Sequence, residues 1–96
     1  MSGMSRFYPV RCGRTVKEQR YIRARLDLWE KLPKDERQAI RDQIWKIAQG
    51  GVERSALEAV VIRGVNPRVA AERYQLDKGR VYQMQRAFLE GFQLWD

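Results

Sequence analysis

Residues 66–88, NPRVAAERYQLDKGRVYQMQRAF, constrain the fold of this chain more than any other stretch. They contain two apolar patterns of helical period, separated by a short polar stretch typical of a tight turn. Two short helices joined in this way cross at close range, which requires a small residue at the crossing. Ala71 meets that requirement, Val81 packs against it, and Leu76 fills the corner. The inner face of the second helix repeats at spacings of three and four: Val81, Met84 and Phe88.

The ends of both patterns carry residues that favour helix caps. Asn66 is a preferred N-cap, and Pro67 loses no hydrogen bond there because its missing N–H falls in the first turn. Asp77 stands where it can cap the second helix. Gln75 occupies the turn position that is usually a left-handed glycine, which costs on the order of 1 kcal/mol. The two helices are expected at residues 67–74 and 78–92.

The rest of the chain also shows helical periods and no strand alternation. Thr15 and Glu18 form a capping-box pattern at the start of a helix. Pro33 separates that helix from the next, which Gly50-Gly51 ends, and Gly64 ends the third. These three helices are expected at residues 16–31, 34–49 and 52–63. The sequence therefore predicts an all-α fold, a small helical domain of five to six helices.

The same patterns set the expected domain limits. Residues 1–14 show no helical period, and Pro9 and Gly13 interrupt them, so we expect a flexible or loosely docked basic N-terminal arm. Residues 15–96 are expected to form a single helical domain with a helix-turn-helix at residues 67–89. A chain of 96 residues buries only a thin core, which favours help from a partner subunit.

The charge of the chain favours partners that are polyanions. The formal net charge is +7 and the sequence pI is about 10.1. Residues 1–31 hold eight Lys and Arg against three Asp and Glu, so most of the excess lies in the first third. Such an excess attracts nucleic acid or an acidic membrane face, although it identifies neither on its own.

The sequence lacks the residues that several classes of function need. The chain has no histidine and a single cysteine, Cys12, which removes the common zinc spacings, the histidine-dependent nucleophile arrangements and an internal disulfide. It has no glycine-rich phosphate loop and no apolar run approaching the ~18 residues of a membrane span. We therefore expect a cytoplasmic protein that is not an enzyme, with no catalytic residues, metal, cofactor, membrane contact or small-molecule substrate.

The second helix of the pair has a polar side that suggests DNA reading. Between Lys78 and Gln85 it holds no acidic residue, whereas a solvated face usually mixes both signs. Arg and Lys can pair with guanine and Gln with adenine in a major groove. The candidate base-reading residues are Lys78, Arg80, Tyr82, Gln83 and Arg86. The candidate phosphate contacts are Asn66, Arg68, Arg73, Lys17, Arg20 and Arg23.

Residues 56–88 resemble the TrfB/KorA family of plasmid transcriptional repressors, and more distantly the PapB-type fimbrial regulators. The shared features are a helix that ends in Gly64, the spacing of Ala71, Leu76 and Val81, and the run DKGRVYQ, which is close to a Thr-Arg-Gly-x-Val-x-Gln pattern. A weaker similarity, from LPKDER followed by a helix-turn-helix, is to region 4 of sigma factors, which implies RNA polymerase as a partner.

The resemblance to the repressors implies operator binding by a homodimer, with Lys78, Arg80 and Gln83 at readout positions. Those repressors continue into a C-terminal dimerisation region, whereas this sequence stops at Asp96, so a dimer must use other residues. For every dimer candidate, the alternative is that the side chain packs in the core of its own subunit. The candidates for the dimer interface are Tyr21, Leu28, Trp29, Phe92, Leu94 and Trp95.

Two functional hypotheses follow. The first is a sequence-specific transcriptional repressor of a plasmid, phage or other mobile element, which binds a palindromic double-stranded DNA operator as a dimer. The second is a small protein-binding module, an inhibitor or adaptor of a host or RNA polymerase complex that uses the same helical scaffold.

Overall fold

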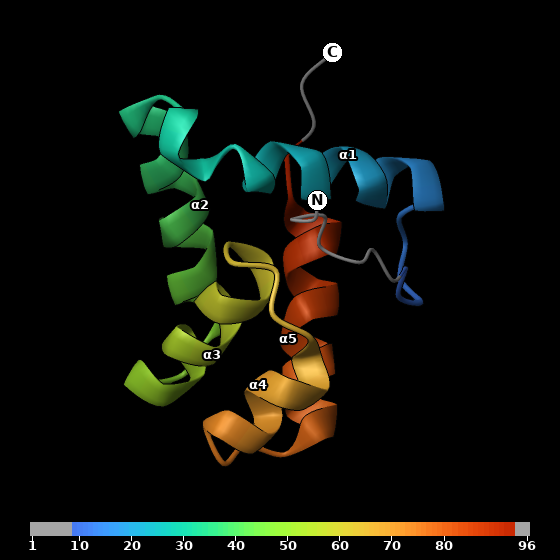
Figure 1. Ribbon diagram of the computed structural model, residues 1–96, viewed down its shortest axis with the longest axis vertical. Coiled ribbons are helices and arrows are strands. Elements are labelled where there is room, and N and C mark those ends of the chain that lie inside the picture. The colour runs from blue at the N-terminus through green and yellow to red at the C-terminus, as the bar shows by residue number, and fades with distance from the viewer. Residues whose placement is uncertain (1–8, 94–96) are drawn as a thin grey trace, which may run out of the picture.

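The computed structural model describes residues 9–93, and every regular element in that range is a helix. The expected all-α fold is therefore confirmed. The described residues form five α-helices, labelled in Figure 1, and one short 3-10 turn, η1, between the first two. Their bounds are α1 Val16–Asp27, η1 Trp29–Lys31, α2 Lys34–Ile47, α3 Gly51–Val61, α4 Pro67–Arg73 and α5 Lys78–Gly91.

Helix α5 is the central element, and it packs against α2, α3 and α4 (Figure 1). Its inner face is the predicted one, because Val81, Met84 and Phe88 are each fully buried. Burying an apolar side chain of this size contributes about 1.5–3 kcal/mol relative to exposure. The three residues therefore anchor α5 in a core that also contains Ile44 of α2 and Leu57 of α3.

Helix α1 lies across the end of α5 that is remote from the α4–α5 turn (Figure 1). Ile22 and Leu26 bury its inner side, and the Thr15–Glu18 capping box is present. The helix ends at Asp27 and not at residue 31 as predicted. Leu32 is extended because the ring of Pro33 excludes helical backbone from the residue before it, so the chain tightens into the η1 turn and starts again as α2.

Glycine backbone shapes the two ends of α3. Gly50 has a φ of +91° and reverses the chain between α2 and α3. Helix α2 ends at Ile47, two residues earlier than predicted, where Ala48 is already extended, and Gly51 begins α3 instead of ending α2. Gly64 has a φ of +74° and directs the chain from α3 toward α4. Both glycines take a backbone conformation that L side chains avoid.

The connection between α4 and α5 matches the predicted geometry of the turn. The Asn66 and Asp77 side chains cap the two helices as expected. Gln75 has a φ of 56°, the left-handed conformation that the sequence required of it. The Leu76 amide donates to the Ala71 carbonyl at 2.8 Å, and the Gln75 amide donates to the carbonyl of residue 72 at 3.3 Å. This pair of bonds is a Schellman ending of α4.

Of the two alternatives for the N-terminal arm, the structure shows a docked segment at residues 9–14. Arg14 donates to the carbonyls of Leu89, at 2.9 Å, and of Phe92 at the end of α5. The buried amide of Gln19 both accepts from the Val10 N–H and donates to the Val10 carbonyl. The apolar period along the chain could not predict these contacts, because they are polar and join residues 9 to 78 positions apart. Residues 1–8 lie outside the described range.

We predict that Gln75→Gly stabilises the fold. Relief of the left-handed strain offsets the extra entropy of glycine in the unfolded chain, and the net gain is roughly 0.5–1 kcal/mol in the free energy of unfolding. Guanidinium chloride denaturation measures it. The matched control is Gln38→Gly within α2, where the same change should cost about 1 kcal/mol. A loss of stability in Gln75→Gly would contradict the assigned turn.

Candidate nucleic-acid interface

The outward side of α4 and α5 is polar and open to solvent. On α5, Lys78, Gln83 and Arg86 are exposed, because the helical period turns them away from Val81, Met84 and Phe88. On α4, Arg68 and Arg73 are exposed in the same way. These five predicted contact residues therefore lie on the two helices that the α4–α5 turn joins, at one end of the molecule for the turn itself and along the outward side of α5 for Arg86 (Figure 1).

Arg80 differs from the other predicted base-reading residues. Its guanidinium turns toward the α2–α3 junction and makes two hydrogen bonds to the Glu53 carboxylate, at 2.8 and 3.0 Å. It also donates to the Ile47 carbonyl at the end of α2 and to the Gln83 amide oxygen. Its side chain is 28% exposed, against 17% for Glu53. The interpretation of Arg80 as a free base-reading residue is corrected, because its donors hold α5 against α2 and α3.

The ion pair changes the titration of both partners. The hydrogen bond from Arg80 lowers the pKa of Glu53, and the hydrogen bond from the Gln49 amide adds to the effect. The hydrogen bond to Glu53 raises the pKa of Arg80. Bidentate geometry and partial burial make this pair stronger than an ordinary surface salt bridge.

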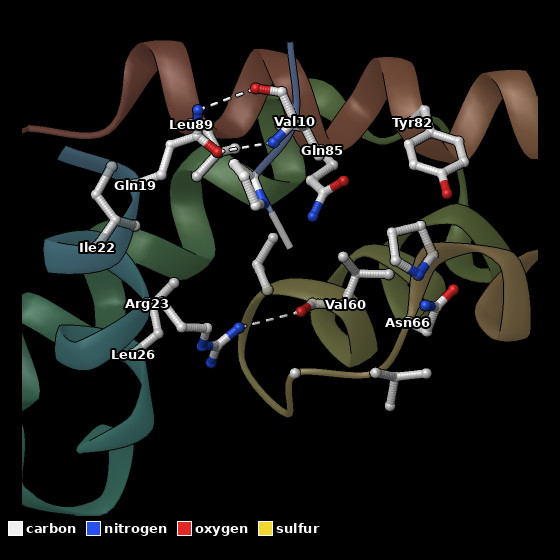
Figure 2. A pocket seen from close by; sticks show the side chains of 15 residues that line it. Val10, Gln19, Ile22, Arg23, Leu26, Val60, Asn66, Tyr82, Gln85 and Leu89 are labelled. Carbon is white, nitrogen blue, oxygen red and sulfur yellow. Dashed lines mark hydrogen bonds between the residues drawn. The ribbon is translucent and has the colours of Figure 1, made fainter. Parts of the chain in front are cut away.

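Tyr82 and Asn66 lie at the edge of the exposed side. Tyr82 is half-buried, and its ring faces a cavity between α5 and the α3–α4 connection (Figure 2). The carbonyl oxygen of the exposed Asn66 side chain accepts from the Arg68 amide, 2.8 Å away, as the cap of α4.

The predicted phosphate contacts on α1 do not join this face. Figure 1 places α1 at the other end of the molecule from the α4–α5 turn. Lys17 and Arg20 are exposed there. The prediction of Arg23 as a phosphate contact is corrected, because its guanidinium is already engaged. It forms an ion pair with Asp27 at 3.0 Å and donates to the Ile62 carbonyl at 3.2 Å. Its side chain is only 17% exposed. Sequence periodicity could not show that this guanidinium folds back onto the end of α3.

The dimer candidates divide into four groups. The prediction of Phe92 as a dimer contact is corrected, because its side chain is 4% exposed and belongs to the core. Its ring packs against that of Phe88, with 5.7 Å between the ring centroids. Trp29 packs partly against the core, under the guanidinium of Arg41. Tyr21 and Leu28 are exposed on the outer side of α1, at 41% and 50%. The remaining candidates lie outside the described residues: Leu94 and Trp95.

The sequence did not predict the contacts of two arginine side chains. Arg63 is exposed just before Gly64, and its guanidinium lies 3.4 Å from the Tyr74 hydroxyl at the end of α4. Arg54 stacks over the exposed ring of Trp45, 3.7 Å from its centroid. Neither contact has a signal in the sequence, because each joins two different helices or connections.

The exposed charges of residues 63–86 favour anions. Five are basic and two are acidic, a local net of +3. One of the acids, Asp77, is also engaged as the cap of α5, where it accepts from the Arg80 amide. The positive members are Arg63, Arg68, Arg73, Lys78 and Arg86, and the other acid is Glu72.

Comparisons with protein-family models, curated protein sequences and solved structures found no match to this chain. The similarity to the TrfB/KorA repressors thus stays a prediction. Within residues 9–93, no helix is both long and apolar enough to cross a membrane. The same residues contain no cluster of three or more His, Cys, Asp or Glu side chains suited to a metal ion.

We predict that the Glu53–Arg80 pair makes stability depend on pH. Because the folded-state pKa of Glu53 is lowered, the folded protein binds fewer protons than the unfolded chain near pH 4. The stabilisation is therefore complete above the unfolded pKa of about 4.3 and is lost as pH falls through the lowered value. Glu53→Gln should cost about 1–2 kcal/mol of unfolding free energy at pH 7 and much less at low pH.

Urea denaturation at a series of pH values measures this difference. Glu30→Gln is the matched control, since Glu30 is exposed on η1. A cost of Glu53→Gln that stays constant across the series would show that the carboxylate charge is not what Arg80 recognises.

Proposed function

We propose that the chain binds double-stranded DNA through α4 and α5, which act as a helix-turn-helix. The observation that carries this proposal is the Schellman turn at Gln75, which joins a seven-residue α4 to α5 and leaves the outer side of α5 exposed. A second helix held in this way can enter a major groove while the first crosses the phosphate backbone.

The exposed residues suggest a division of roles. Gln83 and Arg86 are one turn apart on the outward side of α5 and can pair with base edges, Gln with adenine and Arg with guanine. Lys78 lies at the start of the helix, near the groove wall. Arg68 and Arg73 on α4 are suited to phosphates, which position a protein on the duplex without reading its sequence. Arg80 supports the site by holding α5 in place.

A dimer on a palindromic operator would explain how so small a domain reaches specificity. Two recognition helices must then lie about 34–36 Å apart on one face of the duplex. Tyr21 and Leu28 on the outer side of α1 are the described candidates for the contact. Because α1 lies at the opposite end of the molecule from the α4–α5 turn, a contact through its outer side would set the two α5 helices further apart than this spacing, so a dimer on a palindrome needs a contact surface nearer the turn.

The resemblance of residues 56–88 to plasmid repressors extends the proposal to a biological role. A protein bound to a palindromic operator of a plasmid, phage or other mobile element would repress transcription by occluding the promoter. The proposal requires no catalytic group, cofactor or metal.

We predict that Gln83→Ala and Arg86→Ala abolish sequence preference. Duplexes are first selected from a random pool with the wild-type protein at two salt concentrations. Loss of a base contact should cost about 1–3 kcal/mol on the selected site, or roughly 5–150-fold in affinity, with little change on unrelated DNA. Fluorescence anisotropy measures both. Lys31→Ala on η1 is the control, because it removes an exposed cation at the other end of the molecule.

Arg68→Ala tests the phosphate role separately. It should weaken binding to all sequences about equally and reduce the salt slope by about 1. If wild-type protein enriches no sequence from the pool, DNA reading is excluded. If Gln83→Ala and Arg86→Ala both bind the selected site as tightly as wild type does, α5 is not the reading helix.

A protein-binding module is the second candidate, and one surface favours it. Trp45 is 57% exposed at the end of α2, and Val52 is 54% exposed at the start of α3. Arg54 stacks on the Trp45 ring. Tryptophan and arginine are the residues that most often dominate protein interfaces. A partner captured by the wild type and lost with Trp45→Ala, in binding that salt does not weaken, would favour this function.

A further inference from the structure

The Arg80 guanidinium connects its ion pair with Glu53 to an exposed residue of α5. Its Nε and Nη2 groups donate to the Glu53 carboxylate of α3, and Nη2 also donates to the Ile47 carbonyl, 3.4 Å away, at the end of α2. Its Nη1 group donates to the side-chain oxygen of Gln83, 3.2 Å away. Three hydrogen bonds to α2 and α3 therefore fix the position from which Arg80 holds Gln83.

This contact decides which end of the Gln83 amide faces outward. A guanidinium carries donors only, so the amide must present its oxygen to Arg80, because the reversed amide would set its NH₂ group against those donors. Residues three apart share one side of a helix, so Gln83 reaches Arg80 from the outward side of α5, where it is exposed. The NH₂ group of Gln83 donates to no acceptor within residues 9–93 and is the end left for a ligand.

An amide held in this way matches one purine better than the other. Glutamine pairs with adenine by accepting from N6 and donating to N7, which uses both ends of the amide. The Gln83 oxygen is already engaged by Arg80, whereas its NH₂ group has two hydrogens for acceptors. Guanine presents two neighbouring acceptors in the major groove, O6 and N7, and no donor.

We propose that the Glu53–Arg80 pair makes Gln83 a reader of guanine, with the Gln83 NH₂ group donating to O6 and N7. Glu53 and Arg80 are positioning residues in this role, since they act through Gln83. The inference rests on the proposed entry of α5 into a major groove. It specifies the base that Gln83 reads, where a glutamine without such a contact pairs with adenine.

Selection of duplexes from a random pool with the full-length wild-type chain identifies this base. The position that Gln83 reads is the one whose preference is lost in Gln83→Ala, a variant that should keep its fold because the side chain is exposed. We expect guanine at this position. Fluorescence anisotropy should show that the guanine duplex binds more tightly than the adenine duplex by at least about fivefold.

A double variant tests the positioning role. Glu53→Met combined with Arg80→Met removes the donor to Gln83 and leaves no unpaired charge, so the fold should be retained. The released amide can then pair with adenine, and the ratio of guanine to adenine affinity should fall at least about tenfold. A merely structural role would lower the affinity for both duplexes and leave their ratio unchanged.

The matched control is a second bidentate pair, in which Arg25 of α1 donates to Glu36 of α2 through two hydrogen bonds of 2.7 Å. This pair lies near the start of α2, remote from the α4–α5 turn (Figure 1). Arg25→Met combined with Glu36→Met makes the same chemical change away from Gln83. It should leave the affinity ratio within about twofold of the wild-type value.

The outcomes separate this inference from the proposed function. If the wild-type chain enriches no sequence, both fail, because no base is read. If it enriches a sequence in which the Gln83 position holds any base other than guanine, or in which Gln83→Ala changes no position, this inference alone fails.

An unchanged affinity ratio in the folded double variant would overturn the positioning role of Glu53 and Arg80. Circular dichroism establishes whether that variant is folded. The wild-type selection decides for or against guanine even if the double variant does not fold.

Discussion

The burial of one face of α5 is the contact on which the rest of the structure depends. Val81, Met84 and Phe88 have no exposed surface, and the helices packed around them are α2, α3 and α4. In a chain of 96 residues the unfolding free energy is a small difference between large terms, so the loss of any one of these side chains would be felt throughout. The outward side of the same helix is the proposed DNA-reading surface. Core and candidate site are thus two faces of a single element, and the register of α5 sets both.

Arginine side chains hold several helix ends together in this small domain, and they add to what its thin apolar core contributes. The last turn of a helix leaves backbone carbonyls without intrahelical partners, and a cation is favoured there. Arg14 donates to the Leu89 carbonyl at the end of α5, Arg23 to the Ile62 carbonyl after α3, and Arg80 to the Ile47 carbonyl of α2. Each of these arginines comes from a different part of the chain than the helix end that it supports. The count of 19 Lys and Arg therefore overstates the number of cations that are free to contact a polyanion.

This use of arginine sharpens the functional proposal. The cations that remain exposed around the α4–α5 turn are fewer than the sequence suggested, but they lie together, and Arg80 fixes the helix that carries two of them, Lys78 and Arg86. The opposite flank of α5 lines a cavity that α1 also borders, and the buried Gln85 side-chain oxygen on that flank has no hydrogen-bond partner among residues 9–93. One helix therefore presents three different environments: a dry core, a charged surface and a partly polar cavity.

The sequence by itself determined the local features of this protein. The period of Val81, Met84 and Phe88, the caps at Asn66 and Asp77, and the left-handed Gln75 depend on residues within a few positions of each other, so they could be predicted. Two helix ends were less well predicted: near Pro33, α1 ends four residues before the predicted position, and near Gly50, α2 ends two residues before it. The conformation of a single residue beside proline or glycine can end a helix, and the apolar period does not record it.

Only the tertiary structure decided which polar side chains are available. Arg23 and Arg80 appear as outward cations on a helical wheel, yet each is held by a carboxylate and by a carbonyl at a helix end, and Arg80 reaches partners some 30 residues away, Ile47 and Glu53. Long flexible side chains choose their partners by proximity in space, and that proximity exists only after α5 has packed against its neighbours. The cavity beside Gln85 arises in the same way, from the spacing of three helices that no pattern along the chain encodes.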